Sequence, residues 1–567
     1  MSLTTPFETQ EPCPWDTYPR PQFRRDSYFC LNGTWQLQVW RRKRCAYAGP
    51  VQVPFPPESR RSGVSEPVLP GDGLLYTRSF TLPAGFVKDR VLLHVGACDQ
   101  QAVVNLNGRE LARHQGGYES FTVDLTPALE EGENILQILA RDTLSPRLPY
   151  GKQRQKRGGM WYTPISGLWQ TVWLESVPQA YLHSLRLTPD LEGVRIQVQG
   201  GTGRRVLHFE GKEIPFEGEE YYLKVEDPRL WSPQDPYLYP FAVEDGEDRV
   251  ESYFALRTVS VGRVGATPLL LLNGKPRYFH GVLDQGYFPD GLYLPGSPQG
   301  FENDVLKMKA FGFDTLRKHA KKEPELFYYY CDKHGMLVFQ DMVNAGRYSF
   351  VRDTALPTLG FKRALWKKKN PAHRAGYLAH ARATQESLYN HPSVVYYTLF
   401  NEGWGQFDAD GVFGELSQRD PTRVYDTASG WFGPCDSQVE SAHVYFKPVE
   451  LKKNPRRPLV LSEFGGYSLK VPGHVWQENK EYGYRRFTDG EDLADALEQL
   501  YLSQILPQLD KGLCATVITQ LSDIEDEING FLTYDRRVEK VPPERMKALA
   551  HTLREHFNAL YADTGER

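Results

Sequence analysis

The sequence predicts a multidomain protein with three parts: an N-terminal jelly-roll β-sandwich, an immunoglobulin-like β-sandwich and a C-terminal (β/α)8 TIM barrel. Three observations support this prediction. The chain has 567 residues, which is too long for one ordinary domain. Its first half consists of short strands separated by turn residues, and its second half alternates strand-like with helical segments. We expect the three domains at residues 1–180, 181–262 and 263–567.

Residues 1–180 carry the pattern of an all-β sandwich. Strands are expected at 76–82, 91–95 and 102–106. The last of these runs into Asn107-Gly108, and Asn-Gly between alternating runs is the strongest local signal for a β-hairpin. Because no long helical period interrupts these strands, a sandwich is the expected fold.

Residues 181–262 continue in the same style. Short strands are expected at 194–198 and 253–256, and the span has the size of an immunoglobulin domain. A second, smaller sandwich is therefore predicted between the first domain and the barrel.

After residue 262 strands and helices alternate. A first helix is expected to bury Val305, Leu306, Met308 and Phe311 on one side, and the next opens at Pro324 and ends before Gly335. Eight strands are expected, at 279–283, 313–317, 336–340, 394–400, 423–427, 440–445, 459–463 and 515–520. Eight such units in about 300 residues is the size of a TIM barrel, whose active sites lie at the carboxyl ends of the strands.

Two of these apolar strands deliver a glutamate. Glu402 follows the fourth strand and Glu463 ends the seventh. An unpaired carboxylate is costly to bury, so each side chain is expected at the rim of the sheet. Two facing carboxylates are the minimal equipment for cleaving a glycosidic bond. The alternative is that each glutamate forms a structural ion pair with an arginine, and the strand-end placement of both favours catalysis.

Composition narrows the class of protein. The chain is 40% hydrophobic and 24% charged, with a formal net charge of −4, which gives no electrostatic reason to expect nucleic acid or an anionic membrane as partner. Seven scattered cysteines without C-x-x-C spacing indicate neither a disulfide framework nor a zinc site. With no leader-like or membrane-spanning apolar run, we expect a cytoplasmic protein.

The basic segment 152–159 is expected to be a solvated loop leaning toward the barrel mouth.

Motifs along nearly the whole chain resemble one family. They are Gly116-Gly117-Tyr118, Ile165 to Glu175, Leu230-Trp231-Ser232-Pro233, Leu272-Asn273-Gly274-Lys275-Pro276, His280 to Tyr287, Asn401-Glu402 and Glu463. In this order they resemble glycoside hydrolase family 2, which comprises β-galactosidases, β-glucuronidases, β-mannosidases and relatives.

The resemblance implies roles for the residues at the strand ends. Glu402 would be the general acid/base and Glu463 the nucleophile of a retaining mechanism, with carboxyl groups about 5 to 5.5 Å apart. Asn401 would bind the sugar 2-hydroxyl, with a cap of the turn at the strand end as its alternative, and Arg317 would hold Glu463 ionised. His319 would contact a sugar hydroxyl; the spacing Arg317-Lys318-His319 is tighter than the Arg-x-x-His of many members, and a structural histidine is the alternative.

Further substrate contacts are expected around these residues. Tyr445 would donate a hydrogen bond to the nucleophile, and ordinary packing at the barrel rim is its alternative. Core packing is likewise the alternative for the tryptophans. The remaining candidates for substrate binding are Asp284, Asp341, Trp404, Trp431, His443 and Gln520.

Two departures from family patterns bear on the substrate. Glucuronidases of the family carry Asn-x-Lys near the eighth strand, whereas Asn529-Gly530-Phe531 stands here. Uronic acids are therefore disfavoured unless Arg536 or Arg537 supplies the cation. The Glu-x-His pair that binds magnesium in large β-galactosidases is not found after the third strand, so no metal and no cofactor are expected.

These points favour an exo-acting enzyme that removes a neutral β-linked sugar, with β-galactoside as the leading choice. β-Glucuronidase or another β-glycosidase of the family, acting on a mannoside or arabinopyranoside, is the alternative. A non-catalytic carbohydrate-binding protein is the alternative from another class. The expected partner is a glycoside, and assembly into a homo-oligomer is left open.

Overall fold

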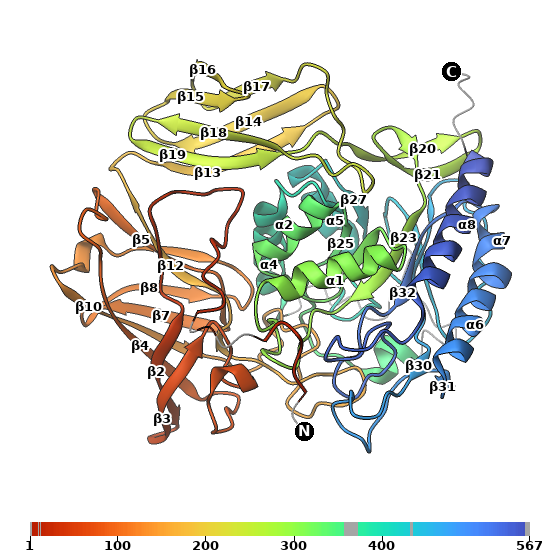
Figure 1. Cartoon of the computed structure of the whole chain (residues 1–567), viewed down its shortest axis with the longest axis horizontal. Helices are drawn as coiled ribbons and strands as arrows, with labels where there is room; N and C mark the ends of the chain where they lie inside the picture. Colours follow the sequence, from red (N-terminus) through yellow and green to blue (C-terminus); the bar gives the residue numbers. More distant parts are fainter. Residues whose placement is uncertain (1–2, 9–10, 12, 356–371, 431–434, 562–567) are drawn as a thin grey trace.

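The computed structural model describes residues 3–8, 11, 13–355, 372–430 and 435–561. Two β-sandwiches lie beside and above a barrel (Figure 1).

The first sandwich packs a four-stranded sheet, ordered β1-β12-β5-β9, on a six-stranded sheet, ordered β3-β2-β4-β10-β7-β8. Its elements are β1 (Tyr28–Cys30), β2 (Gly33–Arg41), β3 (Arg44–Val53), η1 (Arg60–Ser62), β4 (Gly73–Thr81), β5 (Arg90–Val95), β6 (Cys98–Asp99), β7 (Gln101–Leu106), β8 (Arg109–Gln115), β9 (Phe121–Asp124), η2 (Thr126–Ala128), β10 (Glu133–Arg141), β11 (Gly167–Leu168) and β12 (Val172–Val177).

Alternation of apolar and polar residues explains this sandwich. In β10 every second residue is buried, among them Leu136 and Ile138, because successive side chains of a strand point to opposite faces. Asn107 and Gly108 both have positive φ, 51° and 79°, and join β7 to β8 as a hairpin. The predicted hairpin and the predicted sandwich are confirmed.

The second sandwich has seven strands. Sheets ordered β13-β14-β17 and β16-β15-β18-β19 face each other across a core that includes Leu187, Ile196 and Phe241. Its strands are β13 (Leu182–Pro189), β14 (Gly193–Gly200), β15 (Arg204–Phe209), β16 (Lys212–Glu217), β17 (Glu220–Lys224), β18 (Tyr239–Asp245) and β19 (Asp248–Phe254). A small sheet of β20 (Val259–Val264), β21 (Thr267–Leu272) and β22 (Lys275–Pro276) then leads into the barrel.

The barrel has eight strands in the order β27-β26-β25-β24-β23-β32-β29-β28. All seven pairings between them are parallel, and the sheet stays open only between β27 and β28. The strands are β23 (Phe279–Asp284), β24 (Thr315–Lys318), β25 (Leu337–Asp341), β26 (Val394–Thr398), β27 (Val424–Asp426), β28 (Glu440–Val444), β29 (Leu459–Gly465) and β32 (Leu513–Thr519). All eight predicted strands are present, within a few residues of the expected bounds.

Helices cover the outside of the barrel (Figure 1). They and the remaining short elements are α1 (Gln299–Ala310), α2 (Glu325–His334), η3 (Val351–Ala355), α4 (Arg374–Leu388), α5 (Ala409–Arg419), β30 (Ser468–Leu469), β31 (Arg486–Phe487), α6 (Gly490–Leu500), η4 (Tyr501–Ile505), α7 (Leu506–Leu509) and α8 (Pro543–Tyr561). Within the described ranges, no helix combines the length and the apolar character needed to cross a membrane.

The predicted helix faces hold with one exception. Val305, Met308 and Phe311 are buried, whereas Leu306 is 46% exposed. A helix turns 100° per residue, so a position directly after Val305 points away from the buried face. Helix α2 follows Pro324 and ends at Gly335, which adopts the left-handed conformation, as predicted.

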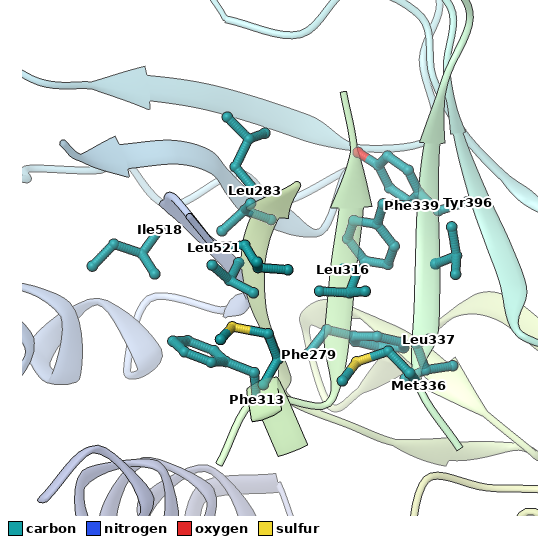
Figure 2. Close-up of a cluster of buried hydrophobic side chains, with 14 of the residues drawn as sticks. Phe279, Leu283, Phe313, Leu316, Met336, Leu337, Phe339, Tyr396, Ile518 and Leu521 are labelled. Carbon is teal, nitrogen blue, oxygen red and sulfur yellow. The ribbon is translucent and has the colours of Figure 1, made fainter. Parts of the chain in front are cut away.

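Apolar side chains fill the lower part of the barrel (Figure 2). The ring of Phe339 stacks on that of Tyr396 at 4.2 Å and lies 5.7 Å from that of Phe279. This layer closes the barrel below the carboxyl ends of the strands, so that the polar residues above it sit on a rigid, water-excluding floor.

Candidate active site

Arg317 lies at the centre of the polar layer. Its guanidinium is fully buried and contacts Asp341 with two hydrogen bonds, both 3.0 Å long. The same group donates to Glu463 Oε1 at 3.0 Å and to Asn401 Oδ1 at 2.8 Å. The planar guanidinium has five N–H donors and can therefore bind several acceptors at once. Through these bonds Arg317 of β24 connects β25 and β29 with the turn after β26.

Glu463 is held as an anion. Besides the Arg317 contact, its Oε2 accepts a hydrogen bond of 2.6 Å from the Tyr445 hydroxyl. Burial opposes ionisation of this carboxyl, but His443, Arg317 and the Tyr445 hydroxyl outweigh it and lower the pKa to about 2. Burial and the adjacent Glu463 raise the pKa of Tyr445 well above its usual range, so Tyr445 remains a donor.

Glu402 lies opposite in different surroundings. Its backbone is in the left-handed region, with φ at 51°, and its amide donates to the carbonyl of Ser429 at 3.1 Å. The side chain is 18% exposed, and its Oε1 contacts His443 Nδ1 at 2.8 Å. One oxygen of Glu402, one of Glu463 and a ring nitrogen of His443 all lie within 4.8 Å of one another.

Asn401 and His319 complete this group. Asn401 Oδ1 accepts from both Arg317 and Ser429, so its Nδ2 is the side that faces outward as a donor. His319 Nδ1 lies 2.6 Å from Asp341 Oδ2. Burial opposes the charge of Asp341, but Arg317 and His319 lower its pKa to about 2. The structure thus brings together eight predicted residues, which are Arg317, His319, Asp341, Asn401, Glu402, His443, Tyr445 and Glu463.

Asp284 is not brought to this group. Its carboxylate accepts from Lys318 Nζ at 2.5 Å and from the amide of Gly286 at 2.8 Å, and Lys318 lies over the ring of Phe327 in α2. Successive strand residues point to opposite faces. Because Arg317 points into the barrel, its neighbour Lys318 and the paired Asp284 face the helix layer instead.

Gln520 belongs to a polar network at the end of β32. Gln285 Nε2 donates to Gln520 Oε1 and to the Tyr162 hydroxyl, both at 2.7 Å. Gln520 in turn donates to Asn529 Oδ1 at 2.7 Å. Glu527 accepts from Asn529 Nδ2 at 3.0 Å and from the Tyr162 hydroxyl. The network is buried and links the first sandwich to the barrel mouth.

The two predicted tryptophans have different outcomes. Trp404 is buried, donates its indole N–H to the carbonyl of Gly346 at 2.9 Å and packs edge-on against Trp161, so it lies within an aromatic cluster. Trp431 lies outside the described residues.

The sequence did not reveal Tyr162, Ser429 or Glu527 as site residues. Tyr162 comes from the first sandwich, and its loop also places Arg157 3.3 Å from Glu525. This loop therefore packs on the barrel mouth, in the direction expected for segment 152–159. It also forms specific contacts there, which the expectation of a solvated loop did not include. In the sequence, the basic segment 152–159 was the signal that could have pointed to this contact.

The cations considered for a uronic acid are engaged elsewhere. Arg536 is fully buried and pairs with Asp304 of α1 at 3.1 Å. Arg537 donates to the carbonyl of Thr4 at 2.9 Å. Neither contacts the residues around Glu402 and Glu463 within the described part of the chain.

Among the residues that the structure describes, two clusters have donor atoms of the kind that hold metals. One is Glu402, His443 and Glu463, and the other is Cys13, Asp16 and Cys30 at the start of the first sandwich. The thiols of the second cluster lie 4.0 Å apart. In the first cluster, the hydrogen bond of His443 to Glu402 and its 3.5 Å contact with Glu463 account for the spacing.

Acid should weaken the fold through this site. Burial opposes ionisation of Glu463 but its partners lower the pKa from 4.5 to about 2, so its stabilising contribution is complete above pH 4.5 and is lost as the pH falls toward 2. We expect about 3 kcal/mol from this group. Urea unfolding at pH 5 and pH 2.5 should show a smaller decrease for Glu463→Gln than for the wild type. Equal decreases would contradict the assigned pKa.

Sequence comparisons agree with this architecture. The family models for the galactose-binding-like domain, the middle domain and the TIM-barrel domain of glycosyl hydrolases family 2 match residues 71–169, 183–257 and 266–490. Together they cover more than half of the chain, in the family's domain order.

Curated relatives carry two kinds of name. A β-galactosidase of Aeromonas hydrophila is 26% identical over 515 residues, which cover 79% of this chain and 47% of that protein. A β-glucuronidase of Paenibacillus borealis is 26% identical over 356 residues, 58% of either chain. This chain thus spans about half the length of the curated relatives it matches.

Solved structures share the fold. A β-galacturonidase of Eisenbergiella tayi bound to galacturonate superposes with a TM-score of 0.68 at 19% identity, covering 94% of this chain and 99% of that one. A β-glucuronidase of Ruminococcus gnavus in complex with D-glucuronic acid gives 0.70 at 17%, covering 96% and 99%.

Proposed function

Because the chain belongs to glycoside hydrolase family 2, we propose that it is a retaining exo-β-glycosidase with Glu463 as nucleophile and Glu402 as general acid/base. One observation carries this proposal: the two glutamates approach within 4.8 Å but have contrasting surroundings. Glu463 is buried against a guanidinium and a phenol. Glu402 is part-exposed and contacts a histidine.

The contrast suits the two roles. The ionised carboxylate of Glu463 attacks the anomeric carbon while the C1–O glycosidic bond breaks. The electron pair of that bond goes to the leaving oxygen, which takes the proton of Glu402. In the second step Glu402 removes a proton from water, the water oxygen bonds to C1, and the ester to Glu463 breaks to restore the carboxylate. A nucleophile must be anionic at the start of this sequence, and the partners of Glu463 supply that state.

The spacing supports retention of configuration. Inverting enzymes hold their carboxyl groups about 6.5 to 9.5 Å apart to admit a water molecule. One oxygen of Glu402 and one of Glu463 lie within 4.8 Å of each other, and so close an approach of the two carboxylates favours the covalent route. In this proposal Asn401, whose Oδ1 accepts from Arg317 and Ser429, uses its Nδ2 to bind the hydroxyl next to the reacting carbon.

For the sugar we propose a neutral β-linked residue, with β-galactoside first. Gln285, Gln520, Asn529 and Glu527 offer amide and carboxylate groups, which suit hydroxyl partners, whereas a carboxylate such as that of Glu527 repels an acidic sugar. Among the described barrel residues nearby, Arg317 and Lys318 are already paired with acids.

A β-glucuronide is the second candidate. The matched β-glucuronidase from Paenibacillus borealis favours it, as does one feature of the barrel mouth. Arg154 lies 4.9 Å over the ring of Trp161, which packs against Trp404, so a cation from the first sandwich stands close to the proposed site.

A panel of 4-nitrophenyl β-glycosides tests the sugar. We expect the highest kcat/KM on the β-galactoside, because a site built from hydrogen-bonding groups strongly rejects the wrong epimer. We also expect no loss of activity in EDTA, because the proposed mechanism uses no metal. A faster rate on the β-glucuronide would overturn the neutral-sugar proposal. Hydrolysis of none of the glycosides would favour a carbohydrate-binding protein instead.

A further inference from the structure

We propose that His443 is a positioning residue that fixes which oxygen of Glu402 carries the catalytic proton. This inference rests on the proposed roles of Glu402 and Glu463. Sequence reasoning expected His443 to bind a sugar hydroxyl, whereas the structure places its fully buried ring between the two carboxylates.

The geometry defines what His443 does. Nδ1 lies 2.8 Å from Glu402 Oε1 and 3.5 Å from Glu463 Oε2. Nε2 lies 3.4 Å from Nη1 of Arg317. A carboxyl oxygen without a proton only accepts, so Nδ1, the ring nitrogen that faces Glu402 Oε1, carries a proton in this contact. Nδ1–H is then the donor toward Glu402 Oε1.

A consequence follows for Glu402. An oxygen that accepts the histidine N–H is the poorer site for the acid proton, so the proton resides on Oε2. Within the described residues, Oε2 has no hydrogen-bond partner, and the side chain is 18% exposed. The proton is thereby directed away from the ring and toward the open side, where the leaving oxygen of a glycoside would arrive.

Gly430 leaves room for this contact. Its φ is +91°, and a Cβ there would lie 3.3 Å from His443 Nδ1 and 3.4 Å from Glu402 Cγ. Only a residue without a side chain tolerates both this backbone conformation and this proximity. A side chain at this position would press on both the histidine and the glutamate, and its absence leaves their contact undisturbed.

The test compares leaving groups. His443→Leu should lower kcat/KM on a methyl or phenyl β-glycoside about 100-fold, within the usual effect of general acid catalysis. The same variant should lose less than about 5-fold on a 2,4-dinitrophenyl β-glycoside, whose leaving group needs little protonation. His443→Asn, which can place an amide donor near the position of Nδ1, should recover part of the loss on the poor leaving groups.

Controls separate the outcomes. His556→Leu, at a half-buried position of α8 whose hydrogen-bond partner among the described residues is Asp510, should behave as wild type. Equal losses for His443→Leu on all leaving groups, or no recovery in His443→Asn, would overturn the positioning role and leave the roles of the glutamates standing. If Glu463→Gln retained activity, the proposed function itself would fail.

Discussion

Glu463→Gln should abolish turnover on every glycoside, with a loss of at least about 10⁴-fold in kcat, because no other described carboxylate occupies its place. The amide is nearly isosteric, so the pocket should keep its shape, but it cannot form the covalent intermediate. Arg317 and Tyr445 would still point at the substituted side chain. Initial rates with 4-nitrophenyl and 2,4-dinitrophenyl substrates measure the effect.

Glu402 provides the matched comparison. Glu402→Ala should lose far less on the dinitrophenyl substrate, since protonation is then dispensable, and azide should restore turnover by attacking the intermediate from the vacated side. Azide should not rescue Glu463→Gln through that route. Equal losses for both variants on the activated substrate, with no azide response in either, would contradict the division of roles.

The eight barrel strands were predictable because buried parallel strands are continuous apolar runs. Val394 to Thr398 and Leu459 to Gly465 form strands as expected, and the glutamates that follow or end them lie at the carboxyl edge. Chain order alone therefore located both carboxylates on the same side of the molecule.

Side-chain direction was harder to predict. Asp284 ends its strand just as Arg317 lies near the end of its own, yet Asp284 contacts Lys318 on the helix side. Which of two adjacent residues faces inward depends on the register between β23 and β24, where Asp284 pairs with Lys318. A one-residue difference reverses the face, and composition carries no record of it.

Contacts between residues far apart in the sequence were equally hidden. Tyr162 reaches Gln285 across 123 positions in the sequence, and His443 meets Glu402 across 41. The sequence marks His443 only as polar at a strand end. Its place between two carboxylates depends on how β28 and the turn after β26 approach each other, which no local pattern encodes.

Arg317 should have the second large effect, on stability as well as on activity. Arg317→Met leaves Asp341 and Glu463 buried without their cation, and removing one partner from a buried ion pair costs about 3–5 kcal/mol. The pKa of Asp341 should rise, because Arg317 is the largest influence opposing its burial. We expect kcat/KM to fall about 10³-fold, since the nucleophile loses a contact that keeps it ionised and Asn401 loses its anchor.

A double variant separates the two effects. Arg317→Met with Asp341→Leu removes the uncompensated carboxylate and should recover part of the unfolding free energy, but no activity, because Glu463 still lacks its guanidinium. Arg536→Met is the matched control: that arginine is equally buried and paired with Asp304, so it should lose stability while the folded enzyme keeps a near wild-type kcat. Activity restored in the double variant would show that Arg317 serves the fold and not the nucleophile.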